Sequence, residues 1–232
     1  MQRAYLIPAY QASRNLAQVL RDLRAHDPEG ALLVVDDGSN DGTGDLARAA
    51  GVDVVTHATN RGKGVALRTG FAWLAARGFE TAVTVDADGQ HRAEDAVMLA
   101  RHEAPADAIV LGVRDLARDG APKPSRFSNR FSNWWVSRFA GVSLSDTQCG
   151  LRRYPLEATL ALDSDARGYG YECELLVRAA RRGLAIIEAP VRVIYPPKAE
   201  RVSHFRVVAD PTRIVLRLVH TALTVPRSQK PR

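Results

Sequence analysis

Several features that define other classes of protein are scarce in this sequence. It contains two cysteines in 232 residues, Cys149 and Cys173, and they lack the CxxC spacing of zinc and redox motifs. No apolar run approaches the roughly 20 residues that a membrane-spanning helix needs. The first residues lead directly into a strand-like run, without the regions of a signal peptide. We therefore expect a protein of a reducing, cytoplasmic compartment that has no disulfide framework, structural zinc or membrane span.

The composition is that of an ordinary globular protein. Hydrophobic residues make up 46% and charged residues 25% of the chain, whose length suits one domain with a full-sized core. The net charge of +6 indicates attraction to anions, which include nucleotides, phospholipids and nucleic acid.

Short β-rich runs alternate with helix-like segments along the first half of the chain. The expected strands are 4–7, 32–35, 52–56, 81–85 and 109–113, and the expected helices are 15–25, 44–50, 65–76 and 93–103. This alternation predicts an α/β fold with a Rossmann-like, mostly parallel sheet and helices on both faces. Ligands of such sheets bind outside the carboxyl ends of the strands. Three polar motifs fall at those ends: Pro8-Ala9-Tyr10, Asp36-Asp37-Gly38-Ser39 and Asp86-Ala87-Asp88.

An acidic motif follows the expected strand 81–85. Asp86 and Asp88 are two residues apart, so both side chains point to the same side of an extended segment, and Gln90 adds a third oxygen to the row. A buried carboxylate is costly unless a positive charge pairs with it. Such oxygens suit Mg²⁺ or Mn²⁺, which keep open positions for phosphate oxygens. A solvated turn is the alternative, because Asp-Gly pairs mark turns.

Two further motifs follow expected strands. In the first, Asp36 and Asp37 can accept hydrogen bonds from a nucleobase or ribose, while Asp41 or Thr43 can cap the next helix. The second, 60–68, is rich in glycine and basic residues at an expected helix N-terminus, which suits an anion. It matches neither common phosphate-loop pattern, so an NTPase or a dinucleotide oxidoreductase is disfavoured.

Together these motifs resemble those of the family 2 glycosyltransferases, and most of all those of the dolichyl- or polyprenyl-phosphate mannose or glucose synthase group. The matching segments are Pro8-Ala9-Tyr10, Asp36-Asp37-Gly38-Ser39, 60–64, 86–91, 145–152, 168–172 and 202–205. The resemblance covers about 4–214. It implies a GT-A fold and an inverting transfer of a hexose from a nucleotide sugar, GDP-mannose or UDP-glucose.

The resemblance also implies roles for individual residues. The implied metal ligands are Asp86, Asp88 and Gln90, and the implied donor site comprises Pro8, Ala9, Tyr10, Asp36, Asp37, Ser39, Lys63, Asp86, Ala87 and Asp88. The metal, Mg²⁺ or Mn²⁺, would neutralise charge on the departing diphosphate, and Asp88 counts as catalytic for this reason. Many relatives carry Asn-Glu where this chain has Gln11-Ala12, which leaves the choice of nucleotide open.

The acceptor is indicated by a segment in the middle of the chain. Ser125 is an expected cap for a helix on which Arg126 and Arg130 lie four residues apart, and Arg suits phosphate. The aromatic residues of this segment are Phe127, Phe131, Trp134, Trp135 and Phe139. Aromatic and basic residues side by side favour a helix in a membrane interface, with a core stripe as the alternative. A lipid phosphate is then the expected acceptor, with Arg201 and His204 as further phosphate ligands.

A phosphate acceptor needs no strong general base, because its second pKa near 6 leaves it anionic at neutral pH. Asp146, in the family's Ser-Asp-Thr position, would orient the acceptor or act as base for a hydroxyl. A helix cap or a salt bridge to Arg152 or Arg153 is the alternative. Glu172 and Glu174 are expected on a helix surface or behind the site.

The chain is expected to divide into a catalytic domain, 1–209, and an amphipathic helix with a basic tail, 210–232. Asp210-Pro211 predicts the start of that helix, which would dock on the domain or bind a membrane or partner. The expected partners are a nucleotide sugar, a lipid phosphate and the cytoplasmic face of a membrane, with a separate membrane subunit as a further candidate. The carboxylates of the cleft disfavour nucleic acid. Two rivals stay open: a glycosyltransferase with a soluble glycan or protein acceptor, and a non-catalytic nucleotide-sugar-binding protein.

Overall fold

The computed structural model describes residues 2–168, 170–195 and 209–226, with the side chains of 209–213 excepted. The strands are β1 (Ala4–Ala9), β2 (Ala31–Asp36), β3 (Asp53–Thr56), β4 (Thr81–Thr84), β5 (Ile109–Arg114), β6 (Arg152–Pro155) and β7 (Ile186–Val191). The helices are α1 (Ser13–His26), α2 (Thr43–Ala49), α3 (Lys63–Ala75), α4 (Ala93–Ala100), α5 (Lys123–Ala140), α6 (Leu156–Ala161), α7 (Gly170–Arg181) and α8 (Ala209–Thr224).

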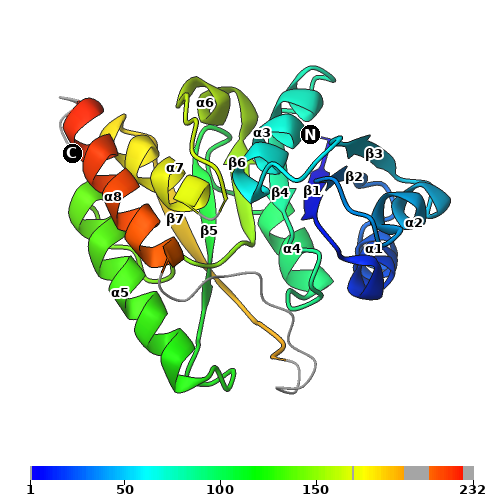
Figure 1. Ribbon diagram of the computed structural model, residues 1–232, viewed down its shortest axis with the longest axis horizontal. Helices are drawn as coiled ribbons and strands as arrows, with labels where there is room; N and C mark the ends of the chain where they lie inside the picture. Colours follow the sequence, from blue (N-terminus) through cyan, green and yellow to red (C-terminus); the bar gives the residue numbers. More distant parts are fainter. Residues whose placement is uncertain (1, 169, 196–208, 227–232) are drawn as a thin grey trace.

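The strands form one seven-stranded sheet in the order β3-β2-β1-β4-β6-β5-β7 (Figure 1). β6 runs antiparallel to both of its neighbours, and the other pairs are parallel. The mostly parallel α/β sheet predicted from the sequence is therefore confirmed. Because β6 is reversed, the segment that leads into it arrives at the edge where β4 and β5 end. That edge carries both the acidic motif and Asp146.

The sheet opens between β1 and β4. These two strands pair at Tyr5 with Val83 and at Leu6 with Thr84, and the pairing stops before Pro8. Proline has no N–H to donate, so its position beyond the last β1–β4 pair costs no hydrogen bond on this side. The order of strands also reverses here, since β2 follows β1 on one side and β4 lies on the other. Such switch points are where open α/β sheets bind ligands.

Each face of the sheet carries its own core. The side chains of β1 alternate between them, with Tyr5 and Ile7 on the face covered by α1, α2 and α4 and Leu6 on the opposite face. The opposite face is covered by α3, α5, α6, α7 and α8. Strands such as β2 are apolar throughout because both of their faces are buried.

The second half of the chain departs from the sequence-based expectations. β6 and β7 were not predicted. Charged residues and proline are uncommon in buried strands, and β6 contains Arg152 and Arg153 while β7 contains Pro190. Both arginines are buried, and their guanidinium groups donate hydrogen bonds to backbone carbonyls rather than to Asp146. The expected cap at Ser125 is wrong, since α5 begins at Lys123 and Ser125 lies in its first turn.

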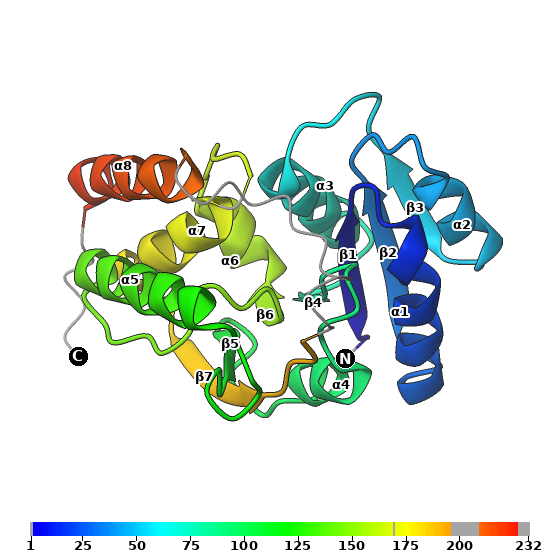
Figure 2. The same cartoon turned by 60° about the horizontal axis from the view of Figure 1, so that its bottom comes forward.

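Helix α8 packs against α5 and α7 (Figure 2). It begins at Ala209, so Asp210 lies inside the helix rather than before it. Glu174 of α7 is fully buried and accepts hydrogen bonds from Arg178, Arg217, Thr221 and Ser164. The expectation of Glu174 on a helix surface is therefore wrong. No helix in the described part of the chain is long and apolar enough to span a membrane.

We expect Glu174→Gln to lower the free energy of unfolding by about 3 kcal/mol at pH 7, because it leaves the buried guanidinium of Arg178 without its negatively charged partner. Burial acts to raise the pKa of Glu174, but the hydrogen bonds from Arg217 and Arg178 outweigh it and lower the pKa. A lowered folded-state pKa stabilises the protein above the ordinary glutamate pKa and less as pH falls. The difference between wild type and variant, measured by urea unfolding, should therefore shrink on acidification. Glu157→Gln, at an exposed position of α6, is the matched control; equal stability of Glu174→Gln and wild type would contradict this role.

Candidate active site

The polar motifs at the carboxyl ends of β1 and β2 are joined by hydrogen bonds. The N–H of Gln11 donates to Ser39 Oγ at 3.0 Å, and that of Ala12 donates to Thr43 Oγ1 at 2.8 Å. Asp41 accepts hydrogen bonds from the N–H groups of Ser13 and Thr43. The N-cap of α2 is Gly42, so the prediction of Asp41 or Thr43 as the cap is wrong. These contacts hold the end of β1 against the loop after β2. Tyr10 lies exposed beside them, while Pro8 and Ala9 are buried in β1.

Asp37 anchors the glycine-rich segment that precedes α3. Its carboxylate accepts hydrogen bonds from the N–H groups of Arg61 and Gly62, at 3.0 and 2.7 Å, and contacts His57 Nδ1 at 2.6 Å. Asp37 is buried, so its oxygens face the protein. Asp36 is buried too, and one of its oxygens accepts the N–H of Ser39. In this structure both carboxylates therefore organise the loops around the cleft.

Lys63 joins the glycine-rich segment to the acidic motif. Its Nζ lies 2.7 Å from Asp86 Oδ1 and 2.9 Å from Glu172 Oε2, in the first turn of α7. Burial acts to lower the pKa of Lys63, but the negative charges of Asp86 and Glu172 raise it overall. Burial likewise acts to raise the pKa of Asp86, yet Lys63 and His91 hold it below its ordinary value. Glu172 is buried in the site, so its expected place on a helix surface is wrong.

Asp88 is the second carboxylate of the acidic motif. Its side chain reaches solvent, yet the surrounding protein and the negative charge of Asp86 raise its pKa. Its Oδ1 accepts the N–H of Gln90 at 2.9 Å, and Ala87 between the two acids is buried. The ring of His91 is almost fully buried. Its Nε2 lies 3.7 Å from Asp86, and its Nδ1 has no hydrogen-bond partner among the described residues.

This cluster has the electrostatics of a cation site. Two neighbouring carboxylates repel each other, and a divalent cation between them would remove the repulsion that raises the pKa of Asp88. In the described ranges, no three His, Cys, Asp or Glu side chains form an all-protein metal cage. Mg²⁺ commonly needs only one or two carboxylates, because substrate phosphates supply further oxygens. Asp86 and Asp88, with Gln90 beside them, fit a metal of this kind.

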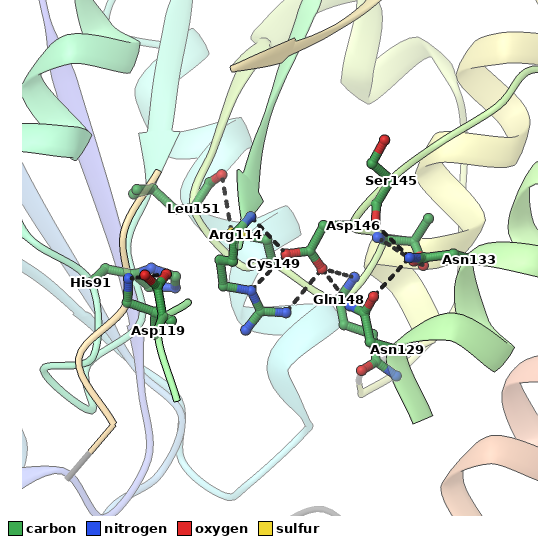
Figure 3. Close-up of polar contacts among 12 residues, drawn as sticks. His91, Arg114, Asp119, Asn129, Asn133, Ser145, Asp146, Gln148, Cys149 and Leu151 are labelled. Carbon is green, nitrogen blue, oxygen red and sulfur yellow. Dashed lines mark hydrogen bonds and ion pairs between the residues drawn. The ribbon is translucent and has the colours of Figure 1, made fainter. Parts of the chain in front are cut away.

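Asp146 lies at the same edge of the sheet, in a dense polar cluster (Figure 3). Arg114, at the end of β5, donates hydrogen bonds from Nε to Asp146 Oδ2 at 2.7 Å and from Nη2 to Asp146 Oδ1 at 2.9 Å. Asn129 of α5 also donates to Oδ1. Burial acts to raise the pKa of Asp146, but the hydrogen bond and charge of Arg114 lower it overall. The expected salt bridge to Arg152 or Arg153 is therefore wrong. An acid that is buried, ionised and saturated with donors is suited to positioning Arg114 rather than to taking a proton.

Helix α5 borders this cluster with one face and solvent with another. Asn129 and Asn133 point toward Asp146 and its neighbours, as Figure 3 shows. Phe127 and Trp134 on the outer side are 73% and 60% exposed, so they do not form a core stripe. Trp135 and Phe139 stack on each other and pack against the core instead.

Of the four basic residues expected to bind the acceptor, the structure describes Arg126 and Arg130. Arg126 is half-buried and Arg130 is exposed, and neither makes an ion pair with any described residue. Arg201 and His204 lie outside the described residues. Arg114 and Glu172 were missed as site residues. A signal for Arg114 existed, because it directly follows the expected strand 109–113; Glu172 reaches the site only through the packing of α7 on α3.

A model of glycosyl transferase family 2 matches residues 5–157, which contain the acidic motif, the glycine-rich segment and Asp146. The chain belongs to glycosyl transferase family 2. The resemblance stated from the motifs is thereby confirmed, and the chain is a glycosyltransferase. Glu172, α7 and α8 lie beyond the matched segment.

Two relatives of this glycosyltransferase extend the match across most of the chain. An undecaprenyl-phosphate mannosyltransferase of Micrococcus luteus is 36% identical over 201 residues, covering 82% of each chain. A polyprenol monophosphomannose synthase of Mycolicibacterium smegmatis is 32% identical over 208 residues, covering 80% of this chain and 75% of its own. These names agree with the polyprenyl-phosphate group predicted from the sequence.

Solved structures agree on the fold. The glucosyl-3-phosphoglycerate synthase of Mycobacterium tuberculosis, in complex with Mn²⁺, UDP and phosphoglyceric acid, superimposes with a TM-score of 0.69 at 20% identity, covering 98% of this chain and 80% of its own. At this level of identity the likeness concerns the fold, which is the GT-A fold expected from the motifs.

Proposed function

We propose that this glycosyltransferase moves a hexose from a nucleotide sugar, GDP-mannose or UDP-glucose, to a polyprenyl phosphate at a membrane surface, with inversion at the sugar carbon. The observation that carries the proposal is the placement of α5. One side of this helix holds the cluster of Arg114 and Asp146, and the other presents exposed Phe127 and Trp134. The names of the two relatives support a lipid phosphate as acceptor.

On the donor side, Asp86 and Asp88 would hold Mg²⁺ or Mn²⁺ with the diphosphate, and Gln90 would lie beside them. The bound metal would neutralise charge on the leaving diphosphate. The chain itself supplies the shape of the pocket. Asp37 fixes the glycine-rich segment, and the contacts between Gln11 and Ser39 fix the loop on which a nucleoside would rest, beside Tyr10.

On the acceptor side, a phosphate dianion would be the nucleophile, so no residue has to remove a proton from it. Arg114 is prepared for an anion, because Asp146 holds its guanidinium in place while one terminal nitrogen makes no hydrogen bond with described residues. Arg126 and Arg130 would extend this positive surface toward the exposed aromatic side chains of α5.

The direct test offers the purified chain radiolabelled GDP-mannose or UDP-glucose with Mn²⁺ or Mg²⁺. Separate reactions contain a polyprenyl phosphate, 3-phosphoglycerate, a soluble glycan or no acceptor. Label that moves into the organic phase only with the polyprenyl phosphate supports the proposal. Label on a soluble acceptor would favour the rival glycosyltransferase, and donor binding without transfer would favour a binding protein.

We expect Arg126→Ala and Arg130→Ala each to raise the KM for the lipid phosphate about tenfold, because each removes a charge-assisted contact with phosphate. The KM for the donor should stay within about twofold in the same steady-state measurements. Arg138→Ala is the matched control, as this arginine lies exposed in the last turn of α5. An unchanged dependence on acceptor would remove both arginines from the acceptor site.

We also expect the exposed aromatic side chains of α5 to bind membranes. The double variant Phe127→Ser and Trp134→Ser should bind anionic vesicles at least about tenfold more weakly in a flotation assay, since both side chains lose apolar burial in the interface. Trp73→Ser, on helix α3, is the control for the loss of a tryptophan outside α5 and should leave vesicle binding unchanged. Equal binding by the α5 double variant and wild type would contradict an interfacial helix.

A further inference from the structure

Lys63 is held by two carboxylates that come from different parts of the fold. Asp86 follows β4, whereas Glu172 lies in the first turn of α7, and Nζ lies within 2.9 Å of both. One ammonium therefore faces two negative charges, of which only Asp86 belongs to the acidic motif. Such a lysine can exchange one partner for the other without losing its counter-ion.

The backbone is shaped to bring Glu172 to Lys63. A Cβ on Gly64 would lie 2.6 Å from Tyr171 Cβ, and one on Gly62 would lie 3.0 Å from the nitrogen of Gly168. Glycine on both sides of Lys63 thus permits the start of α3 to approach the start of α7, which Figure 2 shows beside it. This approach buries Glu172, whose second oxygen, Oε1, has no hydrogen-bond partner in the described part of the chain.

A free oxygen on a buried carboxylate is costly, because the charge has lost its water. Glu172 Oε1 therefore offers a vacant acceptor next to an ammonium group that already touches Oε2. A small rotation of the lysine side chain would let Nζ bond both oxygens of Glu172 and leave Asp86. The same rotation would free Asp86 Oδ1 for a cation.

We propose, building on the metal-dependent transfer inferred above, that Glu172 is a positioning residue that draws Lys63 away from Asp86 when a divalent cation binds. Lys63 and the cation compete for Asp86, because each is positively charged and each would contact Asp86 Oδ1. Glu172 lowers the cost of this exchange by keeping Lys63 neutralised. It also holds the ammonium beside the metal, where the diphosphate of the donor would lie.

The test measures binding of Mn²⁺ by the loss of the free-ion electron paramagnetic resonance signal, with protein alone and with GDP or UDP, corrected for Mn²⁺ held by free nucleotide. Glu172→Gln should raise the Kd for Mn²⁺ about tenfold, because Lys63 then has Asp86 as its sole charged partner. Lys63→Met should lower the Kd, because the competing ammonium is gone. A purely structural role for either residue would not produce opposite changes.

The double variant separates competition from a general effect of charge. In the Lys63→Met background, Glu172→Gln should change the Kd by less than about threefold, since no lysine is left to redirect. Glu157→Gln, an exposed change of equal charge on α6, should leave the Kd unchanged. An equal loss from Glu172→Gln in both backgrounds, or no loss in either, would overturn the role of Glu172 while leaving the proposed transfer intact. Failure of the wild type to bind Mn²⁺ at all would overturn both.

Discussion

Asp88→Ala is expected to reduce sugar transfer about 1000-fold while the protein stays folded. Asp88 is exposed, so its loss would remove a proposed metal ligand without opening the core. Its pKa is raised, which means that the fold disfavours its charged form. Above that pKa the charge lowers stability, so the variant should unfold at the same temperature as wild type or a slightly higher one at neutral pH.

The measurements are the transfer assay with saturating donor and thermal unfolding by circular dichroism. Asp53→Asn on the edge strand β3 is the matched control, since it removes an exposed carboxylate away from the acidic motif. In wild type, transfer should decline on acidification, because protons compete with the cation for the carboxylate of Asp88. Normal transfer by Asp88→Ala would remove Asp88 from the metal site.

Asp146→Asn is expected to reduce kcat/KM for the acceptor about 100-fold, because Arg114 loses the carboxylate that aims it. The amide of asparagine would also bring N–H groups against the donors of Arg114 and Asn129. The KM for the donor should change little. Breaking this buried pair should lower the free energy of unfolding by about 3 kcal/mol, which urea unfolding would detect.

The pH profile decides between positioning and base catalysis. Asp146 has a lowered pKa and stays ionised throughout the neutral range, so the acid limb of the wild-type profile should persist in Asp146→Asn. If Asp146 were the base, that limb would disappear with the residue. Asp107→Asn, at an exposed position before β5, serves as control.

The sequence predicted the first half of the fold, β1 to β4, well. β1 to β4 are short, rich in β-branched or other apolar residues, and separated by helical segments, so their local pattern and their place in the fold agree. The polar ends of three strands were predicted to meet. The hydrogen bonds from Gln11 to Ser39 and from the Asn15 side chain to the Asp88 carbonyl join the segments that follow β1, β2 and β4. Local sequence carries this information because the carboxyl ends of parallel strands all lie at the same edge of the sheet.

The second half was less predictable because its stability comes from long-range contacts. Arg152 reads as a surface residue, yet its buried guanidinium binds the carbonyls of Thr147, Cys149 and Glu172. Asp146 was paired with the nearest arginines in sequence, whereas its partner Arg114 lies 32 residues earlier on another strand. Glu174 resembled a solvated helix residue until the packing of α8 enclosed it. No periodicity in the chain encodes these contacts.

The reversed strand β6 also has a consequence for how mutation could change the substrates of this glycosyltransferase. Its pairing with β4 is the boundary between a parallel unit, β3-β2-β1-β4, that carries the acidic motif, and a smaller unit, β6-β5-β7, that carries Arg114 and lies beside Asp146. Across this boundary the two units share the short register between β4 and β6. If, as proposed, the acceptor binds beside Arg114 and the donor beside the acidic motif, substitutions in the segment before β6 or in α5 would reshape the acceptor side while the donor side keeps its geometry. Under that proposal, mutation could change the acceptor without changing the donor.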